Sequence, residues 1–300
     1  MANGYKKIFK SKSFRLKMLK FLRFVPDKLM LKLEYRIKFE KKLRLKEPKT
    51  YNEKIQWLKL YDRKPIYTTM VDKHAAKEYI SEKIGENYVI PTLGVWDRFE
   101  DIDFDALPEQ FVLKCNHDSG SVLICKDKSS FDFEKAKQVL TEGLKQNGYY
   151  CGREWPYKNV KPCILAEAYL SALDNEELVE YKIFCFDGEA KIVLVCKGQA
   201  HGVGRTNDFM DRDFNRIPVM SLNPHSSPDP ARPEQLDEII TIAEKLSADI
   251  PQLRVDTYIA NGKVYVGELT FFHNSGMSKF EPEEWDYTFG SWIKLPKEGK

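Results

Sequence analysis

The sequence predicts an α+β fold in which helices accompany two antiparallel sheets. Apolar residues recur at helical spacing over residues 52–61, 133–146 and 233–246, which indicates amphipathic helices. Runs rich in β-branched and aromatic residues lie between them, and short turns join several of these runs. Because short turns connect antiparallel strands, this order argues against a doubly wound parallel sheet.

The front of the chain, residues 1–64, is expected to be a basic helical region. It holds 21 Lys or Arg against 6 Asp or Glu, although the whole chain of 300 residues has a net charge of only +3. Apolar residues recur there at about helical spacing: Phe14, Met18, Leu22, Val25 and Leu29. Such a helix fits either an anionic membrane surface, contacted through residues 1–44, or the acidic remainder of the protein. Nucleic acid is not an expected partner, because the positive charge is confined to this front and no RNA-binding motif follows.

Two helices and a strand are expected next. The helix at 52–61 is ended by Pro65, and a second helix spans 68–84 and carries Lys73 in its early part. Residues 89–96 then form a strand that enters a new layer.

The rest of the chain alternates strands with helices. The elements expected, in chain order, are strands at 111–115 and 122–125, a helix at 133–146, a strand at 163–166, strands at 181–186 and 190–196, and a helix at 233–246. Residues 199–232, with their Gly, Asn, Asp and Pro content, are expected to form a long functional loop followed by a connector. We divide the chain into the basic region 1–64, a small subdomain at 65–160 and a C-terminal subdomain at 161–300.

Composition predicts a globular protein of the cytosol. With 42% hydrophobic residues the chain can bury a substantial core, and it has neither a long apolar run nor a signal peptide. Its six cysteines show no C-x-x-C pair and mostly lie in apolar runs, so we expect reduced, buried thiols.

Two acidic residues near the end of the chain lie on neighbouring predicted strands. Arg254 and Asp256 precede an Asn-Gly turn, and Glu268 follows it. A strict two-residue turn pairs Asp256 with Gly267, so Asp256 faces Glu268 only if the turn is longer or the ribbon is bulged. Such a pair is either solvated or holds Mg²⁺ against a polyphosphate, with the arginine neutralising the group in transfer.

A lysine lies inside an apolar strand. Lys114 belongs to the run 111–115, where a buried cation needs an anionic partner such as a nucleotide phosphate. The loop 116–121 that follows offers backbone N–H groups, two serines and one glycine to cover phosphates, but it lacks the P-loop pattern.

The order of these motifs resembles the ATP-grasp superfamily. The motifs are Asp72-Lys73, Phe111-Val112-Leu113-Lys114, Leu165-Ala166-Glu167, Arg254-x-Asp256 and Glu268. A second set is similar to the TupA-like branch, named for teichuronopeptide assembly: residues 48–59, Lys114-Cys115-Asn116-His117, Gly152-Arg153-Glu154-Trp155-Pro156-Tyr157 and Tyr181-Lys182-Ile183-Phe184. The resemblance implies an ATP-grasp fold, in which two α+β subdomains with antiparallel sheets clamp the nucleotide.

The resemblance also implies site residues, carried over by position. For ATP they are the phosphate lysines Lys73 and Lys114, the closing loop with His117, Ser119, Gly120 and Ser121, the adenine hinge with Glu167, Tyr169 and Leu170, and Glu180 at the ribose. For Mg²⁺ they are Asp256, Glu268 and Thr270, and for catalysis Arg254 at the phosphoryl group and Lys182 at the carboxylate substrate or a phosphate.

The activity implied is that of an ATP-dependent carboxylate-amine ligase. MgATP phosphorylates a carboxylate, and an amine then attacks the acyl phosphate to leave an amide, ADP and phosphate. The family context suggests that an amino acid or amine is joined to a sugar acid in bacterial surface polysaccharide biosynthesis, in the cytoplasm or at the inner face of the cell membrane.

Two alternatives stay open. Asp101-x-Asp103 and Asp211-x-Asp213 have the D-x-D form of a metal-dependent glycosyltransferase of polysaccharide synthesis. An inactive ATP-grasp membrane adaptor is the other, because Asp118 and Ser121 replace frequent glycines of the family and Thr270 replaces a frequent asparagine.

Overall fold

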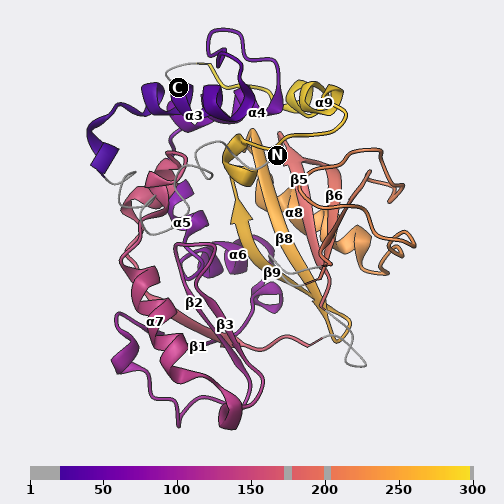
Figure 1. Cartoon of the computed structure of the whole chain (residues 1–300). Coiled ribbons are helices and arrows are strands. Elements are labelled where there is room, and N and C mark those ends of the chain that lie inside the picture. Colours follow the sequence, from indigo (N-terminus) through magenta and orange to yellow (C-terminus); the bar gives the residue numbers. More distant parts are fainter. Residues whose placement is uncertain (1–20, 172–177, 199–203, 298–300) are drawn as a thin grey trace.

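The computed structural model describes residues 21–171, 178–198 and 204–297. Figure 1 shows a layer of helices at one end of the molecule, a large sheet beneath it and a smaller sheet at the opposite end. Every pair of neighbouring strands in the two sheets is antiparallel, which confirms the predicted α+β class. In the described part of the chain no helix has both the length and the apolar content needed to cross a bilayer.

The small sheet has the strand order β1-β4-β2-β3. Its strands are β1 (Thr92–Trp96), β2 (Phe111–Cys115), β3 (Val122–Cys125) and β4 (Ile164–Ala168). Helix α7 (Phe133–Leu144) begins where the Asp132 side chain accepts a hydrogen bond from the Lys135 N–H, and it packs on β2. Phe111, Leu113 and Leu140 are fully buried between helix and sheet, so the small sheet has a core of its own.

Strand β4 belongs to the small sheet although it follows residue 160, where we placed the subdomain boundary. It pairs with both β1 and β2 and is therefore a central strand. Helices α5 (Ile66–Val71) and α6 (Ala76–Ile84), in contrast, bury Met70 and Ile80 in the core of the large sheet. The chain thus crosses between the two sheets more than once, which no local pattern reveals.

The large sheet has the strand order β7-β6-β5-β8-β9. Its strands are β5 (Glu180–Phe186), β6 (Glu189–Lys197), β7 (Thr206–Met210), β8 (Gln252–Ala260) and β9 (Lys263–Thr270). Helix α8 (Leu236–Ser247) packs on β5, β6 and β8. At the end of β5, Phe186 contacts the rings of Tyr51 and Trp292 from the helical layer.

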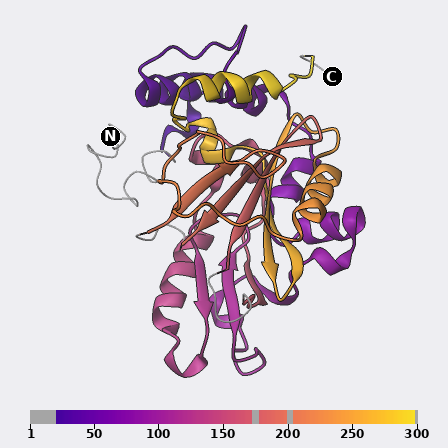
Figure 2. The same ribbon diagram turned by 90° about the vertical axis from the view of Figure 1, so that its right-hand side faces the viewer.

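The helical layer contains α3 (Asp27–Phe39), α4 (Tyr51–Tyr61) and α9 (Glu284–Trp292), and Figure 2 shows α9 beside the N-terminal helices. The helix predicted at 52–61 is confirmed as α4. It begins with a capping box, in which the Thr50 hydroxyl accepts from the Glu53 N–H at 3.2 Å and Glu53 Oε2 accepts from the Thr50 N–H at 3.2 Å. Asn52 then ties the layer to the segment that follows β9, because its Nδ2 donates to the Ser278 carbonyl oxygen at 2.8 Å.

The single helix predicted over 68–84 is wrong, because α5 and α6 are separate. Asp72 leaves helical geometry with ψ 111°, and its Oδ1 accepts from the His74 N–H and from Asn116 Nδ2, both at 2.9 Å. A contact with the small sheet therefore overrides local helix propensity.

Two further expectations differ from the structure. The stretch 199–232 is not one loop, because it contains β7, which pairs with β6; buried Asn207 and Asp208 conceal the strand pattern. The helix expected through Leu29 is interrupted at Pro26, directly before α3 begins at Asp27, and its part within residues 1–20 lies outside the described residues.

Candidate active site

Polar side chains from three neighbouring strands meet on one face of the large sheet. Period-two alternation supplies Glu180 and Lys182 from β5, Arg254, Asp256 and Tyr258 from β8, and Glu268 and Thr270 from β9. Cross-strand pairing aligns them, because Lys182 stands opposite Asp256 and Asp256 stands opposite Glu268. Tyr258 was not predicted, although its place two residues after Asp256 is a signal that the sequence carries.

A β-bulge brings the two carboxylates opposite each other. The turn between β8 and β9 has two residues, both with positive φ, and the register shifts next to Asp256. Asp256 therefore pairs with Glu268, and Gly267 is the extra residue of the bulge. A Cβ at Gly267 would lie 2.5 Å from Cε2 of Tyr258, so this position has no room for a side chain.

Arg254 joins the two carboxylates from a buried position. Its Nε and Nη2 donate to Oδ1 and Oδ2 of Asp256 at 2.6 and 2.7 Å, a bidentate pair. Nη2 also lies 3.2 Å from Oε1 of Glu268 and 3.1 Å from Oγ1 of Thr270. The guanidinium plane is thereby fixed at the point where β8 and β9 present their oxygen atoms.

His273 holds the remaining nitrogen of this guanidinium. Arg254 Nη1 lies 2.6 Å from His273 Nδ1. Burial first, and then the charges of Arg254 and Lys182, lower the pKa of His273 well below its usual range. The imidazole is therefore neutral near pH 7, and its Nδ1 accepts the hydrogen bond that orients Arg254.

Lys182 bridges the carboxylates of β5 and β8. Its Nζ donates to Asp256 Oδ2 at 2.5 Å and to Glu180 Oε1 at 2.6 Å. Glu180 in turn accepts from Arg205 Nη2 at 3.0 Å and from the Tyr258 hydroxyl at 3.2 Å. Burial raises the pKa of Glu180, but Lys182 outweighs burial and the net pKa is lowered, so this carboxylate is charged.

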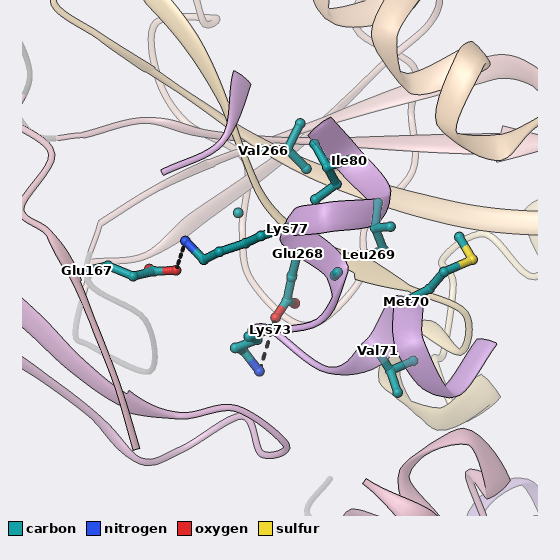
Figure 3. Close-up of a pocket in the computed structure, with 11 residues that line it drawn as sticks. Met70, Val71, Lys73, Lys77, Ile80, Glu167, Val266, Glu268 and Leu269 are labelled. Atoms are coloured by element: carbon teal, nitrogen blue, oxygen red, sulfur yellow. Dashed lines mark ion pairs between the residues drawn. The ribbon is translucent and has the colours of Figure 1, made fainter. Parts of the chain in front are cut away.

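Three lysines lie near this surface. Figure 3 shows two of them at a small cavity, Lys73 from the link between α5 and α6 and Lys77 from α6. Lys73 Nζ lies 3.6 Å from Glu268 Oε2, at the end of the large sheet's β9. Lys114 of β2 lies 2.5 Å from one oxygen of Glu167, and Lys77 of α6 lies 2.8 Å from the other. Lys77 was not predicted, although in the helix predicted over 68–84 it would lie one helical turn after Lys73.

The cations set the charge state of Glu268. Burial by itself raises the pKa of Glu268, but Lys73, Arg254, Lys182 and Lys114 outweigh burial and hold it well below its usual range. The carboxylate is thus ionised, as a metal ligand must be.

The loop 116–121 is held by its own acidic residue. Asp118 Oδ1 accepts from the Ser121 N–H at 3.2 Å and from the Gly120 N–H at 3.4 Å, and Oδ2 accepts from the Ser121 hydroxyl at 2.5 Å. The backbone oxygen of Asp118 accepts from Lys73 Nζ at 2.6 Å. The negative charge of Asp118 is therefore directed into the loop, while Ser119 and Gly120 are exposed at its tip.

Some predicted residues are engaged elsewhere. The ring nitrogens of His117 lie 3.0 Å from Asn116 Oδ1 and 3.1 Å from the Gln146 oxygen, so the scaffold occupies both. Tyr169 and Leu170 follow β4 and are half-buried. Arg153, from the TupA-like motif, is buried against the front of the chain, where Nη2 donates to the Leu22 oxygen at 2.7 Å.

The donor set fits Mg²⁺ in chemical type. Asp256, Glu268 and Thr270 offer hard oxygen atoms at one point, and Mg²⁺ is commonly held by one or two carboxylates together with substrate phosphates. Among the described residues no three His, Cys, Asp or Glu side chains gather as a complete metal site. The residues that could hold a metal ion here are therefore the carboxylate pair and its neighbouring hydroxyl.

The two clamped antiparallel sheets, with lysines facing paired carboxylates, define the ATP-grasp class of proteins. The chain belongs to the TupA-like ATP-grasp family, whose family model matches residues 53–294. No curated protein matches the chain.

Three solved structures are similar to the chain but remote in sequence. D-alanine–D-alanine ligase from Bacillus anthracis in complex with ATP is 18% identical, with 68% of this chain and 54% of that chain covered and a TM-score of 0.38. N5-carboxyaminoimidazole synthetase from Staphylococcus aureus in complex with ADP is 15% identical, with 76% and 52% covered and a TM-score of 0.38. D-alanine–D-alanine ligase from Helicobacter pylori is 12% identical, with 76% and 60% covered and a TM-score of 0.43. The chain thus spans 52–60% of the length of these proteins, and the family match, rather than any of them, assigns it.

Proposed function

We propose that this protein is an ATP-dependent carboxylate-amine ligase. The pairing of Asp256 with Glu268 beside Arg254 is the observation that carries the proposal, because it sets two hard oxygen ligands and a fixed planar cation at one point. Around it the ion pairs of the cleft join six cations to four carboxylates. A nucleoside triphosphate supplies the negative charge that this cluster lacks.

The nucleotide would lie between the two sheets. Lys73 and Lys114 would exchange their present partners for phosphate oxygens, and Lys77 would keep Glu167 paired when Lys114 turns away. The backbone of residues 167–170 would hold the adenine, Glu180 would accept from the ribose, and the loop 116–121 would cover the phosphates and exclude water.

The reaction would run in two displacements. A substrate carboxylate oxygen attacks the γ-phosphorus, the bond from that phosphorus to the β–γ bridging oxygen breaks, and ADP leaves. An amine then attacks the carbonyl carbon of the acyl phosphate, loses a proton, and expels phosphate to leave the amide. Lys182 would bind the substrate carboxylate, and Arg254 would neutralise charge on the transferred group. Asp256, Glu268 and Thr270 would hold Mg²⁺, which supplies positive charge against the phosphates when bound.

The substrates we propose follow from the family. A sugar acid would supply the carboxylate and an amino acid or amine the nucleophile, in bacterial surface polysaccharide biosynthesis. The reaction would take place in the cytoplasm, at the inner face of the membrane.

Calorimetry with MgATP tests the first step of this proposal. We expect Lys114→Ala and the double variant Asp256→Asn/Glu268→Gln to weaken binding at least about ten-fold, because each removes charge-assisted contacts worth about 1.5–3 kcal/mol. Lys137→Ala, an exposed lysine of α7, is the matched control and should bind as the wild type does. A folded wild type that binds no MgATP would refute the ligase proposal.

The same experiment separates the alternatives. In the structure Asp101 is held by Arg98 at 2.5 Å and Asp103 Oδ1 accepts two backbone N–H groups, so this D-x-D pair stabilises an exposed turn. Binding of a UDP-sugar that is lost in Asp101→Asn/Asp103→Asn would favour a glycosyltransferase. Binding of neither nucleotide would favour the inactive adaptor, and MgATP binding followed by ADP release on addition of sugar acids with amines would support the ligase.

A further inference from the structure

Helix α3 buries one face, and no described segment covers its opposite face, which carries a row of basic and a row of apolar side chains. Met30, Leu31 and Tyr35 are at most 4% exposed, and Leu31 and Tyr35 belong to the main hydrophobic core. On the opposite face, three pairs of adjacent exposed residues follow one another at intervals of one helical turn. Each pair has a basic and an apolar member: Lys28 with Leu29, Lys32 with Leu33, and Arg36 with Ile37. We call these six residues the α3 ladder.

The apolar stripe of the ladder is substantial. Leu29, Leu33 and Ile37 are 59%, 50% and 44% exposed, and nearby Phe21 and Phe24 are each 79% exposed. These five are nearly half of the large apolar side chains that are exposed in the described residues. Scattered single apolar residues are normal on a surface, but a contiguous row at one end of the molecule indicates an interaction site.

The basic stripe of the ladder is largely uncompensated. Neighbouring cations have acidic partners, as Arg63 has Asp27 and Lys41 has Glu283, whereas Lys32 and Arg36 form no ion pair with any described residue. Within the described ranges, Lys28 contacts the ring of Tyr61, 6.0 Å away, and forms no ion pair. The surface next to the apolar row is therefore positively charged.

Charge decides which occupant suits this surface. A second copy related by a two-fold axis would bring the basic stripe against an identical basic stripe, which is unfavourable. Residues 1–20 carry seven Lys or Arg and no Asp or Glu, so they would be repelled in the same way. A partner with an apolar interior beneath a negatively charged surface would bury the apolar stripe and attract the basic stripe. The interface of a bilayer that contains anionic lipid has both properties.

We propose that the α3 ladder docks this protein on an anionic membrane surface, with Leu29, Leu33 and Ile37 among the acyl chains and Lys28, Lys32 and Arg36 at the headgroups. Figures 1 and 2 show α3 at the end of the molecule opposite the small sheet. Docking there leaves the small sheet and its loop 116–121 free to close on a ligand. The proposal is independent of the ligase activity, because it requires neither ATP nor a substrate.

Co-sedimentation of the full chain with vesicles tests the proposal. We expect binding to vesicles of phosphatidylcholine with phosphatidylserine, and little binding to phosphatidylcholine alone. The variant Lys32→Glu/Arg36→Glu should bind at least about 25-fold more weakly at low salt, since each basic residue near an anionic surface strengthens binding about five-fold. The variant Leu33→Gln/Ile37→Gln should also bind more weakly, and its loss should persist at high salt because it is apolar in origin.

The control variant Lys135→Glu/Lys263→Glu makes the same charge change at exposed lysines on α7 and β9. It should retain nearly all vesicle binding, which would distinguish an effect of the ladder's position from an effect of the protein's net charge. Circular dichroism and MgATP binding should be unchanged in both ladder variants, because the ladder is remote from the cleft. Equal losses in the control and the ladder variants, or vesicle binding that the ladder variants leave intact, would overturn the proposal. A wild-type dimer that the ladder variants convert to a monomer would also overturn it, in favour of a second copy.

Discussion

Replacing Gly267 with alanine should damage the carboxylate pair without touching either carboxylate. The added methyl group would lie 2.5 Å from Cε2 of Tyr258, whereas ordinary contacts of this kind begin near 3.4 Å. The overlap of about 1 Å must be relieved by moving the buried ring or by straightening the bulge, at a cost of about 1–3 kcal/mol in the free energy of unfolding. Straightening the bulge would carry Glu268 away from its place opposite Asp256.

The expected effect on the site follows from how little displacement of its ligands a Mg²⁺ site tolerates. Mg²⁺ requires oxygen ligands at about 2.1 Å in near-octahedral geometry, and a misplacement of about 1 Å can cost about 100-fold in rate. We therefore expect Gly267→Ala to lower MgATP affinity, or ATP-dependent turnover once substrates are known, by about 10- to 100-fold. Calorimetry gives the affinity, and urea unfolding gives the stability.

A second glycine of the same hairpin provides the control. Gly262 has φ +74° and nothing within 4 Å of an added Cβ, so Gly262→Ala carries backbone strain alone. It should cost about 1–2 kcal/mol of stability and leave MgATP affinity unchanged. Shortening Tyr258 to leucine in the Gly267→Ala background should recover part of the stability. A Gly267→Ala protein that is as stable as the wild type and binds MgATP equally well would refute the assignment of the bulge.

Three further predictions concern Lys59, a buried residue of α4, and two residues of the cleft. Burial lowers the pKa of Lys59 from 10.5 to about 8, so the folded protein loses this proton at a lower pH than the unfolded chain does. The free energy of unfolding should therefore rise between about pH 8 and 10.5, by up to about 3 kcal/mol. Lys59→Met should lack this rise, and urea unfolding across that range measures the difference; parallel pH profiles would contradict it. His273→Ala should lower turnover by about 10-fold or more while MgATP affinity is kept, because Arg254 loses its Nδ1 acceptor, and His273→Gln should restore part of the rate; an unchanged rate in His273→Ala would show that Arg254 does not depend on this contact. Asp118→Ala should increase amide hydrogen exchange over residues 119–121, because the Gly120 and Ser121 N–H groups lose their acceptor, and Asp118→Asn should largely reverse the increase. A similar gain in MgATP affinity for both variants would indicate instead that Asp118 repels the phosphates.

Local patterns were sufficient for most of the secondary structure. The strands 111–115 and 122–125 were predicted with the bounds they have as β2 and β3, and the helix at 133–146 is α7. Where prediction failed, a distant partner had changed the local outcome. Asn116 bonds Asp72 and separates α5 from α6, and β7 is a strand because β6 offers it an edge.

The sequence by itself determined the family, the kinds of side chain in the cleft and the alternation that sends Arg254 and Asp256 to one face of β8. It also determined that Asp256 could face Glu268 only if the turn is longer than two residues or the ribbon is bulged, because a strict two-residue turn pairs Asp256 with Gly267. Tertiary structure decided that the bulge falls at Gly267, under the ring of Tyr258. It likewise decided that Lys77 pairs with Glu167 and that no described segment covers the α3 ladder, because both depend on how the sheets and helices pack.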